Sequence, residues 1–406
     1  MNGTVHTLPR RGPRRRVLIT GGAGFIGTNL ADRLAGDGST VFVLDDLSRP
    51  GVEGNLEWLT AKHPRHVRAE VGKVTDAKLL ARMVGEVDTV YHLAAQVAVT
   101  LSLADALHDF EVNARGTVQL LEAVKARDLP PQLVFTSTNK VYGDLSSHEM
   151  VLRGDRYEPA DETLRRHGVD ESTPLDFHSP YGCSKGAADQ YVLDAARSFR
   201  LPTTVFRMSC IYGPHQFGTE DQGWVAHFLI RALEGRAITL FGDGKQVRDV
   251  LFVEDLVDAM LLARQQIDRV RGQAFNIGGG PANAVSLLEL VEMIGALQGT
   301  PPVVTFDDWR PGDQRYYVSG IRHFQEATGW TPRVPVRDGV QRLYAWLCAH
   351  RTGEAERPTV HRTSAETGIE TNSASGDGRE GGPRAAVQER IELTTRNLEG
   401  VHGKHR

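Results

Sequence analysis

Short apolar runs rich in valine alternate with longer segments of helical periodicity through the first half of the chain. The apolar runs predict strands at 16–20, 41–45, 66–71, 87–92, 132–136 and 203–207. The segments between them repeat apolar residues at helical spacing and predict helices at 25–35, 76–84, 109–127 and 181–199. This alternation predicts an α/β fold, namely a doubly wound parallel sheet with helices on both faces.

The second half of the chain is less regular. Its patterns predict a helix at 222–234, strands at 237–241 and 247–252, a helix at 254–267, a strand at 273–277, and helices at 286–296 and 336–349. We therefore expect a first domain over 16–210 and a smaller mixed C-terminal lobe over 211–350. The strand and helix around 237–267 are expected to return to the first domain.

The ends of the chain differ from both domains. Residues 1–15 are rich in arginine and residues 351–406 are polar, so we expect a disordered basic arm and a disordered tail. The formal net charge of −4 and the lack of a long apolar run give no reason to expect nucleic-acid or membrane binding. The three cysteines have neither disulfide-framework nor zinc-site spacing, which argues against a metal site and favours a reducing cytoplasm.

Glycines with GxxGxxG spacing follow the first predicted strand, at Gly21, Gly24 and Gly27. Glycine lets the backbone turn tightly and approach a pyrophosphate, and the helix that follows supplies free N–H groups. Glycine spacing alone is weak evidence, because glycines close many turns. The second strand, however, ends at Asp45, where a carboxylate would bond the adenosine ribose and repel a 2′-phosphate. Together these features predict a dinucleotide site that takes NAD rather than NADP.

Tyr181 and Lys185 stand four positions apart at the start of a predicted helix, so their side chains would share one face. Of nine tyrosines, Tyr181 alone has a lysine four residues later. A solvated lysine beside a half-buried ring is the ordinary interpretation of such a pair. Next to a dinucleotide, the lysine ammonium and the positive nicotinamide ring would lower the phenol pKa and make Tyr181 a base.

These motifs resemble those of the extended short-chain dehydrogenase/reductase family, and within it the nucleotide-sugar epimerases. Further matches are HLAA at 92–95, VNARGT at 112–117, TSTNKVYG at 136–143, VRDVLFVEDL at 247–256, FNIGGG at 275–280 and RPGD at 310–313. The resemblance implies a Rossmann domain with a small C-terminal substrate lobe, NAD as cofactor and a nucleotide-diphosphate sugar as substrate. It also implies a homodimer joined through helices at about 102–126 and 182–199.

The resemblance further implies three groups of site residues. The catalytic set would be Thr138, Tyr181 and Lys185. The NAD-binding set would comprise Gly21, Gly24, Phe25, Ile26, Gly27, Asp45, Val74, Ala94, Asn113, Tyr181 and Lys185. The substrate-binding set would comprise Ser209, Cys210, Trp224, Arg248 and Arg310. One departure is Lys73, where the family usually has a carboxylate that accepts a hydrogen bond from the adenine amine.

The two residues after Thr138 bear on the reaction. Sugar-nucleotide dehydratases of this family place an acid and a base there, whereas this sequence has Asn139 and Lys140, so epimerisation is preferred over elimination. A narrower likeness, in PLDFHSPYGCSKGAADQYV and FGTEDQGWVAHF, implies inversion at C2 of a CDP-linked 3,6-dideoxyhexose. A C4-type epimerase of a UDP- or GDP-hexose and a non-catalytic NAD-binding regulatory protein stay open as alternatives.

Several of the expected substrate contacts have ordinary alternatives. Arg248 and Arg310 suit a diphosphate, but each could instead be a surface ion-pair partner of Asp249 or Asp313. Trp224 would either stack on a ring or belong to the core. The long connection between Gly143 and Tyr181 has a mixed composition, so we expect an ordered lid over the sugar.

Overall fold

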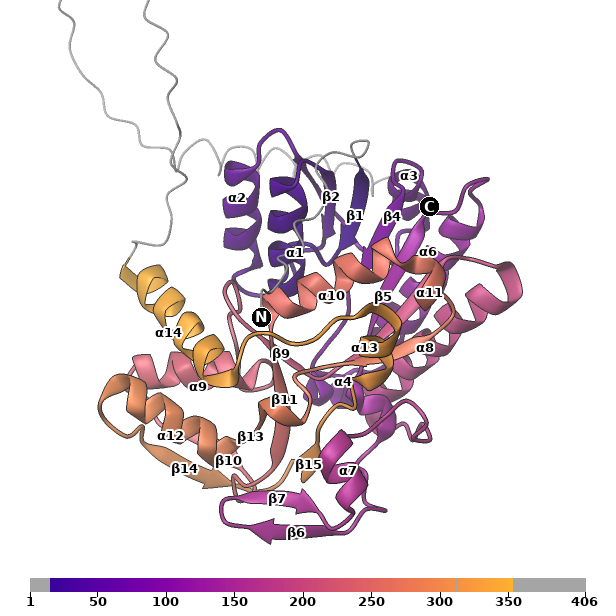
Figure 1. Cartoon of the computed structure of the whole chain (residues 1–406). Helices are drawn as coiled ribbons and strands as arrows, with labels where there is room; N and C mark the ends of the chain where they lie inside the picture. Colours follow the sequence, from indigo (N-terminus) through magenta and orange to yellow (C-terminus); the bar gives the residue numbers. More distant parts are fainter. Residues whose placement is uncertain (1–14, 311–312, 353–406) are drawn as a thin grey trace, which may run out of the picture. The chain divides into compact units, whose positions relative to one another are not determined.

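A computed structural model describes residues 15–310 and 313–352. Its central sheet has seven parallel strands in the order β12-β8-β5-β4-β1-β2-β3. Figure 1 labels four of them, β5, β4, β1 and β2. The strands are β1 (Arg16–Thr20), β2 (Thr40–Asp45), β3 (Val67–Val71), β4 (Thr89–His92), β5 (Gln132–Thr138), β8 (Thr203–Met208) and β12 (Ala274–Ile277). Each corresponds to a predicted apolar run. The doubly wound α/β architecture is therefore confirmed.

Helices cover both faces of this sheet, because consecutive side chains on each strand point to opposite sides. In β1, Val17 and Ile19 pack against one group of helices, while Leu18 packs against the other. The first group is α1 (Phe25–Gly36), α2 (Val52–Lys62) and α10 (Val253–Gln265), and the second is α3 (Ala77–Val84), α6 (Gly116–Lys125) and α8 (Ser179–Phe199) (Figure 1). Helix α2 was not predicted from the sequence, because it buries few apolar residues and its periodicity is weak.

The smaller lobe combines short strands with longer helices around a core of its own. Its strands are β9 (Cys210–Tyr212), β10 (Ile238–Phe241), β11 (Val247–Phe252), β13 (Ala284–Ser286), β14 (Val304–Asp307) and β15 (Tyr316–Tyr317). β10 pairs with β14, and β11 pairs with β9, β13 and β15. The helices α9 (Trp224–Leu233), α12 (Leu287–Gln298) and α14 (Val336–Thr352) contribute to the same core.

We expected both the strand and the helix around 237–267 to return to the first domain, but only the helix does so. Helix α10 packs against α1, but the strand that joins the central sheet is β12, which pairs with β8. Strands β10 and β11 belong to the smaller sheets instead. Two neighbouring parallel strands must be joined by a crossover connection, here one that includes helix α10. Strand β12 follows α10 in the chain and can therefore pair with β8, whereas β10 and β11 come before α10.

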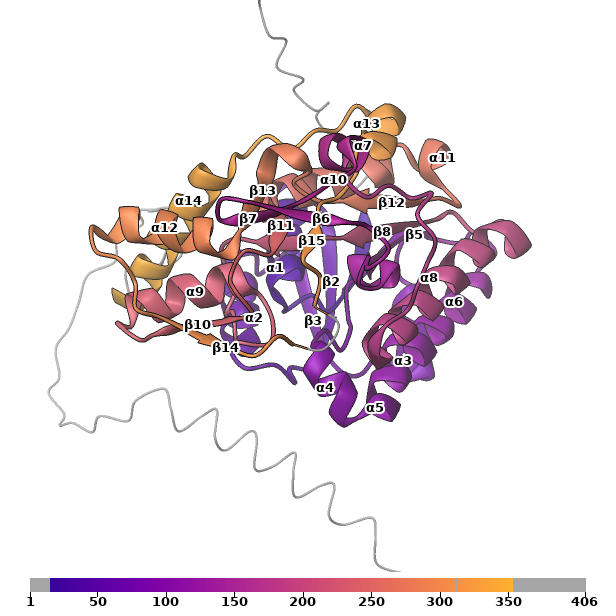
Figure 2. The same ribbon diagram turned by 90° about the horizontal axis from the view of Figure 1, so that it is seen from below.

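The connection between Gly143 and Tyr181 has secondary structure of its own. It forms an antiparallel hairpin of β6 (Met150–Arg153) and β7 (Arg156–Pro159), followed by α7 (Glu162–His167). Strand β7 contacts β11, β13 and β15 of the smaller lobe (Figure 2). Leu164 and Val169 pack with Tyr142 in a small apolar cluster. The segment is ordered, as expected, and its position over a sugar remains a prediction.

Short elements complete the described structure. They are α4 (Val99–Ala104), α5 (Ala106–Phe110), the π-helical turn η1 (Glu111–Arg115), η2 (Asn139–Tyr142), α11 (Ile267–Val270), η3 (Pro281–Asn283) and α13 (Arg322–Thr328). The arm predicted at 1–15 and the tail predicted at 351–406 lie outside the described residues, apart from Arg15 and the end of α14. Across residues 15–310 and 313–352, no helix has the length and apolar character needed to cross a membrane.

Candidate functional site

The glycine turn between β1 and α1 leaves no room for side chains. Gly21 has a left-handed φ of 71°, and a Cβ there would lie 2.7 Å from the backbone nitrogen of Ala94. A Cβ at Gly27 would collide with the carbonyl oxygen of Gly21. Helix α1 begins at Phe25 after Gly24, and none of the described side chains caps its first N–H groups. The turn therefore presents backbone N–H groups at a helix N-terminus, which fits the pyrophosphate of a dinucleotide.

Asp45 ends β2 beside this turn. Its carboxylate accepts hydrogen bonds from the backbone N–H groups of Ala23 and Leu47, each at 3.0 Å. Burial raises the pKa of the carboxyl, and these N–H groups oppose the shift. Asp45 thus ties the glycine turn to β2 and places a carboxylate at the carboxyl edge of the sheet, where ligands of such sheets bind.

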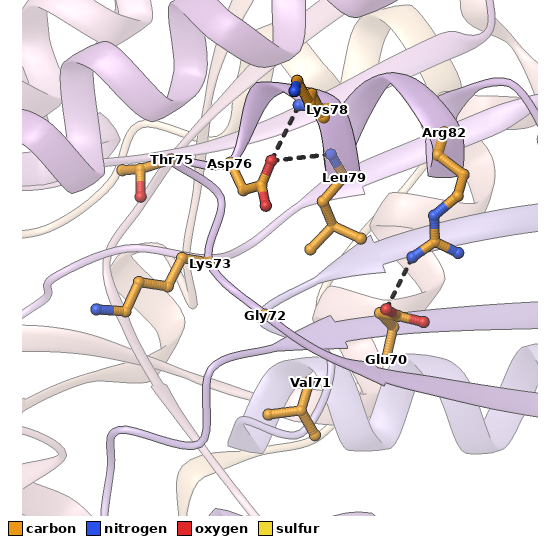
Figure 3. A pocket seen from close by; sticks show the side chains of 9 residues that line it. All are labelled: Glu70, Val71, Gly72, Lys73, Thr75, Asp76, Lys78, Leu79 and Arg82. Carbon is orange, nitrogen blue, oxygen red and sulfur yellow. Dashed lines mark hydrogen bonds and ion pairs between the residues drawn. The ribbon is translucent and has the colours of Figure 1, made fainter. Parts of the chain in front are cut away.

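An open depression of about 630 Å³ lies past the end of β3 (Figure 3). It is lined by Glu70, Val71, Gly72, Lys73, Thr75, Asp76, Lys78, Leu79 and Arg82. Gly72 donates its N–H to the carbonyl of Asp45 at 2.9 Å, so the depression adjoins the side of the sheet expected to take adenosine. Lys73 is exposed and extends away from the ion pair of Glu70 and Arg82 (Figure 3), while the next residue, Val74, is buried.

A buried hydrogen-bond chain supports the ends of β1 and β4. The two ring nitrogens of His92 contact the hydroxyls of Thr20 at 2.6 Å and Thr117 at 3.1 Å. Thr20 accepts a hydrogen bond from the backbone N–H of Ala94 at 3.3 Å. Burial, reinforced by the charge of Lys185, lowers the pKa of His92 to about 3. The imidazole is therefore neutral and holds Ala94 in place rather than exchanging protons, a role that the HLAA motif did not reveal.

Asn113 lies in η1, where the helix predicted at 109–127 is interrupted. Its side chain exchanges hydrogen bonds with the backbone of Gln96 at 2.9 and 3.0 Å and donates to Ser184 at 3.1 Å. Ser184 also donates to the buried carboxylate of Asp109. Asn113 therefore connects the segment after β4 with the start of α8, and π-helical turns often occur at such functional positions. Its contact with NAD remains a prediction.

Thr138, Tyr181 and Lys185 lie in the interior, each at most 9% exposed. Thr138 ends β5, and the other two residues occupy the first two turns of α8 on one face. The backbone N–H of Tyr181 donates to the hydroxyl of Ser102 at 3.2 Å, which satisfies a free group at the helix N-terminus. The fold thus brings the three residues of the predicted catalytic set, with their hydroxyl, phenol and ammonium groups, into one buried region.

The phenol of Tyr181 is held in its neutral form by its surroundings. Burial raises the pKa of Tyr181 to about 12, although a hydrogen bond with Thr138 lowers it. This differs from the expectation that Lys185 would lower the phenol pKa. The reason is that the ammonium of Lys185 donates to the backbone carbonyl of Thr136 at 2.6 Å, and burial of the phenol dominates.

Lys185 is itself strongly affected by burial. Its ammonium lies 4.3 Å from the ring centre of Phe135. Burial lowers the pKa of Lys185 to about 7, while the charges of Asp189 and then Asp109 oppose the shift. The site therefore holds a lysine that changes charge near neutral pH, which is typical of functional positions.

A group of charged and polar residues that includes Lys140 lies near Thr138. Arg248, on β11, is buried and pairs with Asp313 at 2.5 Å, so it is not a surface ion-pair residue. Lys140 and Cys210 interact electrostatically with Arg248, and Lys140 also with Asp313. We refer to Lys140, Cys210, Arg248 and Asp313 as the Lys140 cluster. Burial raises the pKa of the Cys210 thiol, which is therefore neutral.

Ser209 and Trp224 have structural partners of their own. The hydroxyl of Ser209 donates to the carboxylate of Asp249 at 2.5 Å, which ties the end of β8 to β11. Trp224 is partly buried, meets Phe228 edge to face with ring centres 5.6 Å apart, and lies beside Cys210. Trp224 is thus part of the lobe's packing, and its contact with a substrate remains a prediction.

Arg310 lies at the rim of the lobe. Its guanidinium stands 3.8 Å from the ring centre of Phe241 and forms ion pairs with Glu220 at 3.2 Å and Asp221 at 4.0 Å. The sequence suggested Asp249 or Asp313 as its partner, but both acids of this pairing come from the loop before α9, and Asp313 pairs with Arg248 instead. The sequence analysis did not identify Lys140 as a site residue, although its position directly after Thr138 and Asn139 indicated that it lies close to the predicted catalytic threonine.

Known proteins with similar sequences and structures define the class of this protein. Residues 17–278 match the NAD dependent epimerase/dehydratase family, and the chain belongs to this family. It is 44% identical over 338 residues to CDP-paratose 2-epimerase of Salmonella typhi, which covers 82% of this chain and 98% of that protein. It is 33% identical to UDP-glucose 4-epimerase of Mycolicibacterium smegmatis, covering 80% and 96% of the two chains.

A solved structure supports the same classification. UDP-glucuronic acid 4-epimerase of Bacillus cereus, in complex with UDP-glucuronic acid and NAD, matches with a TM-score of 0.71 at 26% identity, covering 82% of this chain and 99% of that one. The family, the enzyme class and NAD as cofactor, which the motifs predicted, are therefore confirmed.

Proposed function

We propose that this protein is an NAD-dependent nucleotide-sugar epimerase that inverts C2 of CDP-paratose or a close analogue. The 44% identity to CDP-paratose 2-epimerase, over almost the whole of that relative, supports the substrate. One observation carries the reaction type: Asn139 and Lys140 follow Thr138, where elimination would need an acid and a base. The amide of Asn139 cannot remove a proton, and neither residue supplies the carboxylate of an acid–base pair. Burial and then the charge of Arg248 lower the pKa of Lys140, while the charge of Asp313 opposes the shift.

The residues around the glycine turn fit NAD in both space and charge. The pyrophosphate would be held by the glycine turn, namely Gly21, Gly24, Phe25, Ile26 and Gly27. Asp45 would bind the adenosine ribose. The rest of the NAD molecule would be contacted by Val74, Ala94, Asn113, Tyr181 and Lys185. Bound NAD supplies the hydride acceptor, and its positive nicotinamide ring favours the phenolate form of a nearby tyrosine. The space left by the glycines and the carboxylate at the end of β2 support this assignment.

Tyr181 is the proposed base. Its phenolate removes the proton of the C2 hydroxyl as hydride leaves C2, and the hydroxyl of Thr138 donates a hydrogen bond to the same oxygen. Burial of both residues keeps water out and strengthens the effect of nearby positive charge on the phenol. Bound NAD would return hydride to the opposite face of the 2-keto sugar, and Tyr181 would give the proton back to the oxygen at C2. C2 is inverted with no net change of oxidation state.

The substrate's diphosphate and sugar would lie against the smaller lobe. Arg248 and Arg310 would bind the diphosphate, because a planar guanidinium can bind two phosphate oxygens at once. Cys210 and Trp224 would line the sugar pocket, with Ser209 contributing little beyond its backbone because its hydroxyl is engaged by Asp249. Small and apolar surfaces of this kind suit a dideoxy sugar, which has few hydroxyl groups to satisfy.

A homodimer in the cytoplasm completes the proposal. Large apolar residues on the two helical segments expected to meet a second copy are half to mostly exposed: Leu101, Leu103, Leu107, Phe110, Tyr191 and Phe199. Exposed large apolar side chains on the helices expected to meet a second copy favour association. None of the three cysteines, all of which lie in the described part of the chain, forms a disulfide, which fits a reducing compartment.

The experiment that tests the function follows sugar proton couplings by NMR. The purified protein is incubated, without added NAD, with CDP-paratose, CDP-glucose, UDP-glucose and GDP-mannose. Inversion at C2 of a CDP-sugar is the expected result. Inversion at another carbon, or only of a UDP- or GDP-sugar, would favour the C4-type epimerase. The absence of any turnover, even after NAD is added, would favour the non-catalytic regulatory protein.

A further inference from the structure

Asp109, on α5, is a fully buried carboxylate beside the start of α8. One of its oxygens accepts a hydrogen bond from the hydroxyl of Ser184, and the other accepts from the amides of Gln96 at 2.9 Å and Asn113 at 3.1 Å. All three donors are neutral, and across residues 15–310 and 313–352 no cation pairs with the carboxylate within 4.0 Å. A buried carboxylate without a paired cation is costly, which indicates a role beyond packing.

The three donors come from separate parts of the candidate site. Gln96 follows β4, and its backbone N–H donates to the side chain of Asn113 in η1 at 2.9 Å. Ser184 lies on α8 directly before Lys185, and its hydroxyl oxygen accepts from Asn113 at 3.1 Å. Asp109 therefore ties the segment after β4 to the first turns of α8, which carry two of the three proposed catalytic residues.

The hydrogen bond with Ser184 brings the charge of Asp109 close to those two residues. Ser184 stands between them in the chain, and its hydroxyl lies 3.3 Å from the carbonyl oxygen of Tyr181. Both carboxylate oxygens accept hydrogen bonds, which is the arrangement of an ionised carboxyl group with no proton to donate. Burial raises the pKa of Asp109, whereas the hydrogen bonds from Ser184 and Gln96 and the charge of Lys185 oppose the rise.

The negative charge acts on Tyr181 and Lys185 in the same direction. Burial lowers the pKa of Lys185, and the charges of Asp189 and then Asp109 oppose the shift. Burial raises the pKa of Tyr181, the hydrogen bond with Thr138 lowers it, and the charge of Asp109 adds to the rise. Loss of this one charge would therefore lower the pKa of both groups.

Other titratable groups near Asp109 and Lys185 are either neutral, exposed or paired with each other. They are the neutral His92, the exposed Cys183 and His108, and the ion pair of Glu111 with Arg115 at 2.6 Å. Helix α4, which also packs against α5, has no titratable side chain.

In the proposed reaction Tyr181 takes up a proton and later gives it back, so its phenol must be neither too weak nor too strong an acid. The ammonium of Lys185 and the nicotinamide ring favour the phenolate, and a buried negative charge nearby limits this effect while it keeps the ammonium protonated. We propose that Asp109 is a positioning residue, which holds the start of α8 against the segment after β4 and whose charge keeps Lys185 protonated beside Tyr181. This inference rests on the proposed function and adds a residue outside the predicted catalytic set.

Asp109→Asn tests the charge, because asparagine has the same shape and still accepts hydrogen bonds through its amide oxygen. Turnover is followed by the NMR assay from about pH 5.5 to pH 10, and both limbs of the pH profile should move to lower pH by roughly half to one unit. Asp105→Asn is the matched control. Asp105 is exposed and caps the same helix by accepting the N–H of His108 at 2.9 Å, and asparagine keeps that cap, so this profile should not move.

Asp109→Ala tests the positioning, because it removes the acceptor of all three hydrogen bonds. Turnover should fall by roughly ten- to a hundredfold while KM for the CDP-sugar stays within about twofold, since displacement of reacting groups slows the chemical step. Asp109→Asn, measured at its own optimum pH, should regain most of this loss. If the alanine variant does not fold, the pH profile of Asp109→Asn decides alone.

A measurement without substrate separates failure of this inference from failure of the proposed function. The free energy of unfolding by urea rises with pH once Lys185 loses its proton in the folded protein, so in Asp109→Asn the rise should begin at a lower pH. An unmoved onset would overturn the inference, as would a turnover profile that stays in place or that moves equally in Asp105→Asn. A moved onset without turnover of any CDP-sugar would support the action of Asp109 on Lys185 and overturn the proposed function instead.

Discussion

The carboxylate of Asp189 accepts two hydrogen bonds from the guanidinium of Arg207, at 2.9 and 3.0 Å. Asp189 lies on α8, one helical turn after Lys185. Both partners are buried, and Arg207 also donates to the phenol oxygen of Tyr142 at 3.0 Å. Because the charge of Asp189 raises the pKa of Lys185, this pair does more than join α8 to β8. It also sets the charge of a residue in the proposed catalytic set.

Asp189→Asn should destabilise the protein and shift the titration of Lys185. Loss of the counter-charge leaves Arg207 unpaired in the interior, which costs roughly 3–5 kcal/mol in the free energy of unfolding by urea. The pKa of Lys185 should fall further, seen as an acid shift in the pH dependence of turnover. Glu122→Gln, which breaks an exposed pair with Lys125, should cost less than about 1 kcal/mol and leave the pH dependence alone. Equal effects of the two changes would contradict this interpretation.

Lys185 should make stability rise with pH between about 7 and 10. Its pKa is about 7 in the folded protein, below the ordinary value of 10.5. The unfolded chain therefore binds more protons in this interval, so the contribution of Lys185 to the unfolding free energy increases as pH rises through it. Below pH 7 both states are protonated and the cost of burying the ammonium is constant. Lys185→Met should reduce the increase in the free energy of unfolding by urea between pH 7 and pH 9.5. An increase as large as that of the unmodified protein would refute the prediction.

Tyr181→Phe should abolish turnover while sparing NAD binding. Removal of a general base lowers rates by roughly 10²–10⁴-fold, and the phenyl ring keeps the buried volume filled. The NMR assay measures turnover, and NAD released on denaturation measures binding. Thr138→Val, which removes the hydrogen bond to the phenol, should reduce turnover without stopping it. Unchanged activity of Tyr181→Phe would exclude the proposed mechanism.

Gly21→Ala should eliminate NAD retention. An alanine would be strained at a φ of 71°, and its Cβ would lie 2.7 Å from the backbone nitrogen of Ala94. Gly36→Ala is the matched control at the other end of α1, where a Cβ meets nothing within 4 Å. The control should keep its NAD and unfold at an unchanged or slightly higher temperature. Comparable NAD loss in both variants would argue against a cofactor at the glycine turn.

Leu107→Glu should convert the proposed homodimer into a monomer, measured by size-exclusion chromatography with light scattering. Leu107 is 71% exposed on α5, and a charge there would be buried on association. Leu129, which is 84% exposed after α6, offers a control outside the expected contact helices. Leu129→Glu should leave the dimer intact. A monomeric unmodified protein would disprove the dimer itself.

Local patterns were sufficient to predict the central sheet and part of the site. A strand such as β1 needs only its own apolar residues, and the four-residue spacing of Tyr181 and Lys185 fixes their common face of α8. Thr138 was placed by resemblance alone, because a threonine at the end of a strand has no distinctive signal. The glycine turn followed from its position between β1 and α1.

Contacts between distant segments could not be predicted. Asp313 reaches Arg248 only after the lobe has folded, and the engagement of Ser209 by Asp249 depends on how β8 meets β11. The π-helical turn around Asn113 was also missed, since one helical period fits residues 109–127 on either side of it. The raised pKa of Tyr181 depends on burial, which spacing along the chain does not report.

The pairing of β12 with β8 has a consequence for biosynthesis of the protein. Until residue 265 has left the ribosome, α1 lacks its cover from α10, and until residue 277 has left it, β8 carries one unpaired row of backbone N–H and C=O groups. By then the nascent chain already includes β9, β10 and β11 of the smaller lobe. Co-translational folding therefore cannot finish the cofactor domain before the substrate lobe has begun, and translation stalled near residue 210 would expose a strand edge prone to aggregation.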